Sequence, residues 1–599
     1  MRDVDTFYNT YNARHLNPRE VAETFIWSSN FEKLIQNNHS VILGARGCGK
    51  TTLMKMLTLP ALYAWKGNNA SFIRKNIPFY SVYISTDIYW DVKNQTYSAQ
   101  LQYFGKFSEV VSTFSVNSNV FKAICETLKN IIEFELEDLD ENKEIELCKY
   151  LMKAWKLNSI VPKLEYVVDA LNERVDEFNQ LIQNVIFNCK TESEIPQKDY
   201  FNLSFESSIE YIIPIFERIY GISENKKWAL CFDELEFAPL WLQQKLFTSL
   251  RSRTQYVLYK LSASPILPME LEKSINKEYG ATPGNDVQII KMWSSSENEN
   301  FSKEIILSLL RKRNIDEVPE SFFGSNDIYN KNPNSYSKGS EFYNEMLELI
   351  NKDFSFRNFL ESYKIDVNDP LPLNSSQKDT IFRKIKPIVY YRNFYIENNK
   401  LEKSGKTSLT LRSRKTGDLY SGIEILCKIC DGNPRWLIGI INSILAKSTE
   451  SSADKKIQYA ELLSAAKKFS NVIANIPIGL RSSYTLRNIV DKVGNYFSDQ
   501  LLGSNFNMDP RGTFIVDDDQ NDISENIIEL LEKGTSQGAF ILLDSADDSF
   551  DFKIRNKRFK LAYLLSLLYK LPLRKYPATK LSQCLNGIES DTIIQTKLF

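Results

Sequence analysis

A glycine-rich stretch near the start of the chain has the residue types and spacing needed to bind nucleotide phosphates. It follows the apolar run Val41–Leu43 and matches the pattern G-x4-G-K-T. Glycines let backbone N–H groups curl around phosphate oxygens, and the helix that follows points its positive end at the same anion. The candidate nucleotide-binding residues are Gly44, Ala45, Arg46, Gly47, Cys48, Gly49, Lys50, Thr51 and Thr52. Within this set, Lys50 would reach the β- and γ-phosphates, and Thr51 would offer its hydroxyl to Mg²⁺.

Two acidic residues, Asp233 and Glu234, end a second apolar run that starts at Trp228. A phosphate-binding loop needs such acids opposite it. Asp233 would hold Mg²⁺ through water, and Glu234 would act as the general base toward the attacking water. An apolar run that ends in Asp-Glu is common, and the complete loop upstream is what favours a functional interpretation here. The pair therefore predicts nucleotide hydrolysis rather than binding alone.

Serines and arginines flank the next predicted strand, Gln255–Ser264. We expect this strand to lie between the two nucleotide-facing strands, where Ser262 or Ser264 could orient water or sense the γ-phosphate. For each serine, a strand that simply ends in a polar residue is an equal alternative. Arg251 and Arg253 are candidates for a finger that reaches a neighbouring subunit, but a solvated helix end is the favoured interpretation.

The elements that must position these residues alternate between strands and helices. Further strands are expected at Pro78–Asp87 and Asp286–Trp293, and a helix at Leu240–Arg251. This alternation predicts an α/β fold whose parallel sheet is covered on both faces. Residues 113–200 are mostly helical and highly charged, and we interpret them as a helical insertion within the core domain.

A pair of helices is expected over Ile423–Leu445. Gly432-Asn433 would end the first helix and Pro434 would start the second. Arg435 then falls in the first turn of the second helix, which is apolar on most sides and is predicted to be buried.

The remaining regions complete a division into three parts: a core domain over 1–300, a helical lid with an inserted region over 301–450, and a separate domain over 451–599. In the last part, a helix at Glu525–Lys533, a short strand at Ala539–Leu543 and a basic segment from Arg555 indicate a winged-helix-like α+β module.

One local basic patch is predicted between the core and the last domain, although a solvated helix is the favoured alternative. Its members are Arg383, Lys384, Lys386 and Arg392.

Composition excludes several classes of function. The 599 residues carry a net charge of -1, so contact with nucleic acid would need a local patch. With only two histidines, histidine-based acid–base catalysis and a histidine-rich metal site are improbable. Eight scattered cysteines do not form a disulfide framework, and Cys427-x-x-Cys430 lacks further zinc ligands nearby. The charged N-terminus and the lack of a long apolar stretch predict a cytoplasmic protein without a membrane partner.

The loop, the acidic pair, the polar strand end and Gly432-Asn433-Pro434-Arg435 occur in the order used by AAA+ ATPases. The chain resembles bacterial members of the origin-recognition-like branch and the related STAND NTPases. The resemblance implies that ATP and Mg²⁺ are the cofactors. It also implies that Arg435 is a second sensor, which swings a helical lid onto the γ-phosphate.

The resemblance further implies an ATP-hydrolysing switch in a DNA-linked process, such as antiphage defence or the work of a mobile element. Its partners would be further copies of the chain, a separately encoded effector, and nucleic acid. The alternatives are a DNA-binding replication initiator or loader, and a nucleotide-dependent oligomeric scaffold. The long stretch between the loop and the acidic pair departs from a minimal AAA+ domain.

Overall fold

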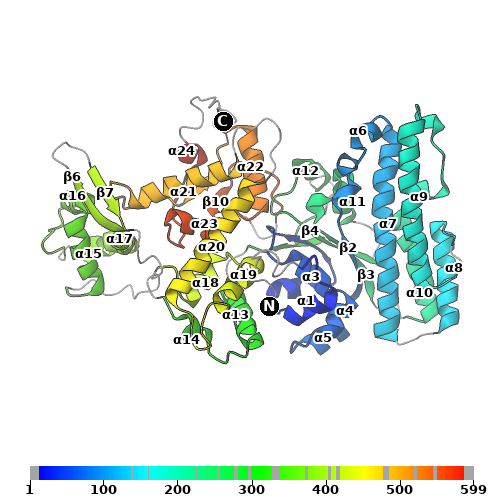
Figure 1. Ribbon diagram of the computed structural model, residues 1–599, viewed down its shortest axis with the longest axis horizontal. Helices are drawn as coiled ribbons and strands as arrows, with labels where there is room; N and C mark the ends of the chain where they lie inside the picture. Colours follow the sequence, from blue (N-terminus) through cyan, green and yellow to red (C-terminus); the bar gives the residue numbers. More distant parts are fainter. Residues whose placement is uncertain are drawn as a thin grey trace.

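The computed structural model describes residues 13–585, apart from short stretches at 137–139, 159–160, 223–225, 252–255, 276–280, 294–297, 327–337, 371–374, 402–406, 413–418, 477–484, 519–522 and 544–548. Figure 1 shows an elongated molecule, with a helical insertion at one end and a small α+β unit at the other. The parallel sheet lies next to the insertion, and the lid and C-terminal module lie between the sheet and the small unit. Within the described residues, no helix has the length and apolar character needed to cross a membrane.

A parallel five-stranded sheet forms the centre of the N-terminal half, as the alternating pattern predicts. Its strands are β1 (His39–Leu43), β2 (Phe79–Ser85), β3 (Lys227–Asp233), β4 (Val257–Ala263) and β5 (Val287–Lys291). The order β2-β3-β4-β1-β5 places β4 between the strand before the glycine-rich loop and the strand that ends in Asp233. Leu43 pairs with Ala263, and Ser85 pairs with Asp233. The carboxyl ends of β1, β3 and β4 therefore meet at one edge.

Helices cover both faces of this sheet. Successive side chains of a strand point to opposite faces, so neighbouring residues of one strand pack into different cores. Ile42 belongs to a core beneath the N-terminal helices, whereas its neighbours Val41 and Leu43 belong to a core beneath the insertion. The N-terminal helices are α1 (Pro18–Thr24), α2 (Ser29–Leu34), α3 (Lys50–Met56), α4 (Leu59–Ala64) and α5 (Ala70–Asn76). Two further helices on the insertion side are α11 (Leu240–Ser249) and α12 (Met269–Ile275).

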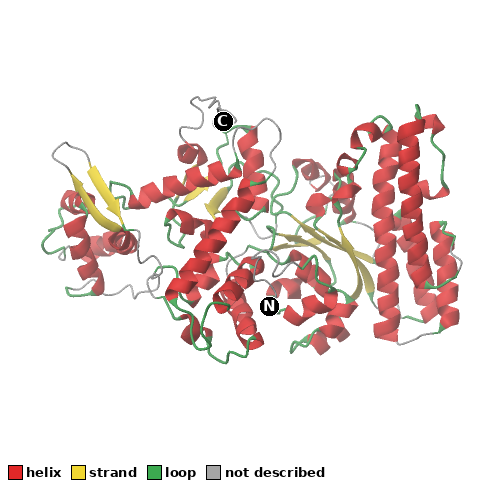
Figure 2. Cartoon of the chain, in the orientation of Figure 1, coloured by secondary structure: helices red, strands yellow, loops and turns green. Residues whose placement is uncertain are grey.

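The helical insertion connects β2 to β3 and stands out as a bundle of long helices (Figure 2). Its helices are α6 (Ser98–Leu101), α7 (Gly105–Ile131), α8 (Glu141–Trp155), α9 (Leu164–Asn188) and α10 (Phe205–Tyr220). The helical region is thus longer than the predicted 113–200, because α7 and α10 also cover the sheet. The part of the insertion away from the sheet has a core of its own. In this core the rings of Phe114, on α7, and Phe178, on α9, stack with centroids 3.9 Å apart.

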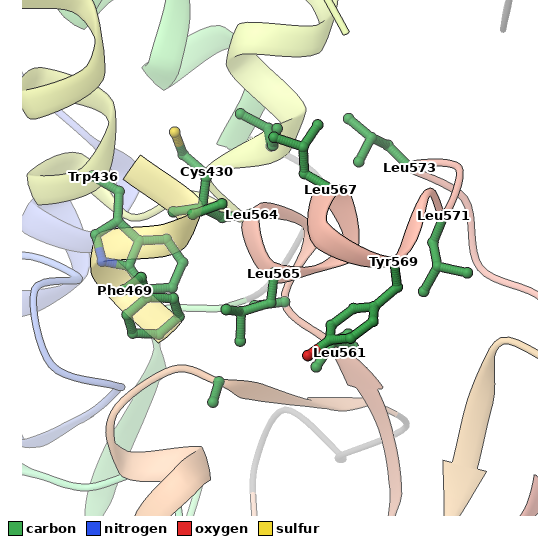
Figure 3. Close-up of a cluster of buried hydrophobic side chains, with 14 of the residues drawn as sticks. Cys430, Trp436, Phe469, Leu561, Leu564, Leu565, Leu567, Tyr569, Leu571 and Leu573 are labelled. Atoms are coloured by element: carbon green, nitrogen blue, oxygen red, sulfur yellow. The ribbon is translucent and has the colours of Figure 1, made fainter. Parts of the chain in front are cut away.

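The lid and the C-terminal module share one hydrophobic core. The lid helices are α13 (Asn298–Lys312), α14 (Pro319–Phe323), α18 (Ile423–Ile429), α19 (Pro434–Leu445) and α20 (Lys455–Ala474). Figure 3 shows Trp436 of α19 against Phe469 of α20, with Leu564 and Leu565 of the C-terminal module beside them. The two rings lie 4.5 Å apart. Because packed interiors resist deformation, this core makes the two parts one mechanical unit.

The C-terminal module combines helices with a four-stranded sheet of order β11-β8-β10-β9. Its elements are α21 (Leu486–Leu502), β8 (Thr513–Ile515), α22 (Glu525–Ser536), β9 (Phe540–Leu543), β10 (Arg558–Leu561), α23 (Tyr563–Ser566), β11 (Ala578–Lys580) and α24 (Leu581–Leu585). The predicted basic segment from Arg555 thus forms strand β10 followed by the short helix α23. The comparison of this module with a winged helix stays a prediction.

The small unit is inserted in the lid. Its structure shows that the predicted basic patch is wrong for one of its members, Arg392. It contains α15 (Glu341–Lys352), α16 (Phe354–Ser362), α17 (Ser375–Tyr395), β6 (Ile396–Leu401) and β7 (Thr407–Leu411). Arg392 of α17 is fully buried rather than solvated. It pairs with buried Asp353 at 2.7 Å and donates hydrogen bonds to the carbonyls of Leu501 and Gly503. Arg392 therefore fastens the small unit to the end of α21 and cannot belong to a surface patch.

We expect Arg392→Met to destabilise the small unit by about 3–5 kcal/mol, because it leaves the Asp353 carboxylate buried without its cationic partner. The effect is measured as the urea concentration at which the 341–411 unit becomes sensitive to protease. Arg383→Met, on the exposed side of the same helix, is the matched control. Equal midpoints for the two variants would contradict the structural role of Arg392.

Candidate functional site

The glycine-rich loop joins β1 to α3, and its geometry explains why glycine occupies these positions. Gly47 and Gly49 adopt φ values of 85° and 103°, which side chains other than glycine rarely tolerate. A Cβ on Gly44 would lie 2.4 Å from the sulfur of Cys48. The loop is therefore shaped for backbone N–H groups to face an anion at the start of α3.

Lys50 lies at the first position of α3 with its side chain buried. Its Nζ donates a 2.5 Å hydrogen bond to the carbonyl of Gly44 and lies 3.5 Å from the carboxylate of Glu236. Burial alone disfavours the charged ammonium, but nearby acidic groups, Glu236 first among them, raise the pKa of Lys50 above its usual value. Lys50 therefore stays cationic at neutral pH and suits phosphate oxygens.

Asp233 ends β3 and is held by side chains from both neighbouring strands. The hydroxyl of Ser262, on β4, donates to its Oδ1 at 2.5 Å, and the hydroxyl of Tyr83, on β2, donates to its Oδ2 at 3.2 Å. The Asp233 side chain is almost fully buried. These two bonds fix its orientation, as the partners of metal-binding carboxylates usually do.

Glu234 follows in the left-handed backbone region, at φ 58°, which is unusual for a residue with a side chain. Its N–H donates to the hydroxyl of Ser262 at 2.9 Å and to Asp233 at 3.1 Å, which stabilises this turn of the chain. Burial first, and then the charge of Asp233, raise the pKa of the Glu234 carboxyl. Such a shift moves a carboxylate toward the range useful for a general base.

The predicted serines occupy different places. Ser264 lines a cavity of about 860 Å³ beside the loop, together with Lys50, Thr51 and Glu234. Ser262 is completely buried and serves Asp233 and Glu234 through the hydrogen bonds described above. A direct role of either serine toward a γ-phosphate stays a prediction, and the geometry gives Ser262 a supporting position.

Arg435 reaches the same cavity from the lid. It lies in the first turn of α19, whose N-cap is Asn433. The side-chain amide of Asn433 donates to the carbonyl of Arg46 at 3.1 Å, so the break between α18 and α19 is attached directly to the glycine-rich loop. A displacement of the loop would therefore also displace the start of α19.

The C-terminal module also touches the loop, which the sequence analysis did not predict. The N–H of Arg46 donates to the carbonyl of Ser536, at the end of α22, at 2.8 Å. The acidic side chains of Glu525, Glu529 and Glu532 on α22 line the cavity. Their spacing of three and four residues indicates one acidic helix face, but the sequence has no signal that places this face opposite the loop.

Two further charged residues at the site were missed. Glu236, the partner of Lys50, stands two residues after Glu234, and the run Asp-Glu-Leu-Glu is the signal that could have found it. Arg14 lies 3.5 Å from the Glu234 carboxylate, and its segment carries no recognisable motif. Arg251 and Arg253 are the candidates for a finger that reaches a neighbouring subunit. Arg251 is exposed just after α11, and Arg253 lies outside the described residues.

A second cavity, of about 470 Å³, lies on the other side of the loop. Its wall is formed by the turn between α1 and α2, which includes Phe25 and Trp27, and by Phe301 and Ile438 of the lid. A largely apolar and aromatic cavity of this size suits a nucleotide base, whose phosphates would extend over Gly49 toward Lys50.

The residues fit a nucleotide triphosphate with Mg²⁺. The hydroxyl of Thr51 and the carboxylate of Asp233 are the hard oxygen donors that Mg²⁺ prefers. In the described part of the chain, no cluster of three or more His, Cys, Asp or Glu residues forms a metal cage of its own.

A protein-family model described as ORC-CDC6-like matches residues 6–581. No curated protein and no solved structure matches the chain significantly.

We expect Ser262→Ala to weaken Mg²⁺-dependent nucleotide binding, because Asp233 loses the hydrogen bond that orients it. The Mg²⁺ concentration for half-maximal binding of ATP should rise about tenfold, as for other lost partners of metal ligands. Titration of a fluorescent ATP analogue with Mg²⁺ measures this value. Ser207→Ala, exposed on α10, is the control and should change it less than about twofold; equal effects of the two variants would contradict the assignment.

Proposed function

The chain belongs to the ORC-CDC6-like family, a group of origin-recognition-like AAA+ ATPases, and on that basis we propose that it binds and hydrolyses ATP as a conformational switch. The observation that carries the proposal is the convergence on one cavity of Lys50 from the loop, Glu234 from the sheet edge and Arg435 from the lid. These are the groups that bind phosphate, activate water and report the γ-phosphate in such a reaction.

The proposed chemistry assigns each group one task. Backbone N–H groups of the loop and the Lys50 ammonium bind the β- and γ-phosphates, while Thr51 and Asp233 hold Mg²⁺. Bound Mg²⁺ neutralises charge on the phosphate oxygens. The Glu234 carboxylate accepts a proton from water as the water oxygen bonds to the γ-phosphorus, and the bond from this phosphorus to the β,γ-bridging oxygen breaks, which releases ADP and phosphate. Ser262 keeps Asp233 and the backbone of Glu234 in fixed relation throughout.

The switch would act through α19. Arg435 binds the γ-phosphate in the ATP state and loses this partner after hydrolysis, so the lid has different contacts in the two states. A ligand can shift a conformational equilibrium only through such differential contacts. Because Trp436 belongs to the core shared with the C-terminal module, the lid and the module would move together.

We further propose that the C-terminal module is winged-helix-like, since α22 precedes the antiparallel pair β9–β10. Family membership favours a DNA-linked process. A DNA-binding initiator or loader is a second candidate function, favoured by the exposed neighbours Arg383 and Lys384 on α17. The antiphage role, the effector and the oligomeric state expected from the sequence stay predictions.

We expect Glu234→Gln to reduce ATP turnover by about 10²-fold or more while ATP binding is retained, because the amide cannot accept the proton. Lys50→Ala should instead weaken binding itself. Turnover is measured as phosphate release with and without duplex DNA, and binding is measured by calorimetry. Glu397→Gln, exposed on β6, is the control. If the wild type releases no phosphate under any condition, hydrolysis is ruled out and a scaffold role is favoured.

A further inference from the structure

The N-terminal segment 13–16 brings a cation to the proposed general base. The guanidinium Nη1 of Arg14 lies 3.5 Å from Oε2 of Glu234. This oxygen is buried and has no hydrogen-bond partner among the described residues. The Glu234 side chain as a whole is 19% exposed and lines the cavity, so Arg14 contacts the buried oxygen while another part of the side chain faces the cavity.

A single buried lysine fixes the backbone that carries Arg14. Lys55, on α3, donates hydrogen bonds from its Nζ to the carbonyls of Ala13 at 2.8 Å, Arg14 at 3.2 Å and Leu16 at 2.7 Å. An ammonium group has three donors, so all of them can be used on this segment. A buried ammonium group is costly unless its donors are satisfied. The N-terminal segment is therefore locked to the helix that starts with Lys50 and Thr51.

The backbone after the segment is fixed as well. Asn17 caps α1, accepting a hydrogen bond from the N–H of Glu20, while the Glu20 carboxylate accepts one from the N–H of Asn17. Arg14 is thus held between the Lys55 contacts and a capped helix, although its side chain is 43% exposed. An exposed ion pair alone would contribute little to stability. The contacts thus fix the backbone around Arg14 rather than its side chain. This indicates that the fixed backbone serves to place the Arg14 side chain.

We propose that Arg14 is a positioning residue for Glu234 and that Lys55 holds it in place. This inference rests on the proposed function, ATP hydrolysis through Glu234. The Arg14 guanidinium restrains Oε2 of the carboxylate at the cavity wall, so that the other oxygen, Oε1, faces the attacking water. Lys55 couples this restraint to α3, the same helix that carries the phosphate-binding Lys50.

The test compares Arg14→Gln, Lys55→Met and Arg14→Lys with the wild type. We expect Arg14→Gln and Lys55→Met to lower kcat about tenfold, a part of the roughly 10²–10⁴-fold that a general base contributes. Arg14→Lys should restore most of the activity. The Kd of ATP should change less than about twofold, since neither residue is assigned to phosphate binding.

Arg19→Gln, exposed on α1, is the matched control and should leave kcat unchanged. Thermal unfolding of each variant separates a loss of structure from a loss of positioning. A normal kcat in Arg14→Gln, with an active wild type, would overturn the role of Arg14 alone. An inactive wild type would overturn the proposed hydrolysis and, with it, this inference.

Discussion

The parallel pairing of β4 with both β1 and β3 is the constraint on which the candidate site depends. It brings the glycine-rich loop, Asp233 and Ser262 to one edge of the sheet although they are far apart in the chain. Parallel strands need crossover connections, and here the connection from β2 to β3 has grown into the whole helical insertion. The insertion therefore lengthens the chain between the loop and the acids without moving either from the sheet edge.

Opposite charges are arranged in pairs around this edge. Glu236 faces Lys50 and Glu234 faces Arg14, while Asp233 is held by neutral hydroxyl donors. Neutral donors orient a carboxylate without satisfying its charge, which leaves Asp233 suited to a cation. The paired acids, in contrast, have their charge partly balanced by protein. This difference supports the proposed division, in which Asp233 binds the metal ion and Glu234 acts as the general base.

The sequence predicts the parts of the site that are encoded locally. The loop, the Asp-Glu strand end and the Gly-Asn-Pro-Arg helix break each have a physical signature in a short stretch, and the structure brings them together. Contacts made by backbone atoms have no such signature, as with the Ser536 carbonyl on Arg46 and the carbonyls held by Lys55. The burial of Arg392 could not be foreseen, because it depends on Asp353, a partner on another helix.

Helix α19 has its first turn at the loop and its body inside the core shared with the C-terminal module. Because a closely packed core resists bending, a rotation of α19 in the proposed switch would carry the C-terminal half with it about Asn433. Displacement grows with distance from a pivot. The small unit, which Arg392 attaches to α21, lies at the far end of Figure 1. It would then undergo the largest displacement in the molecule.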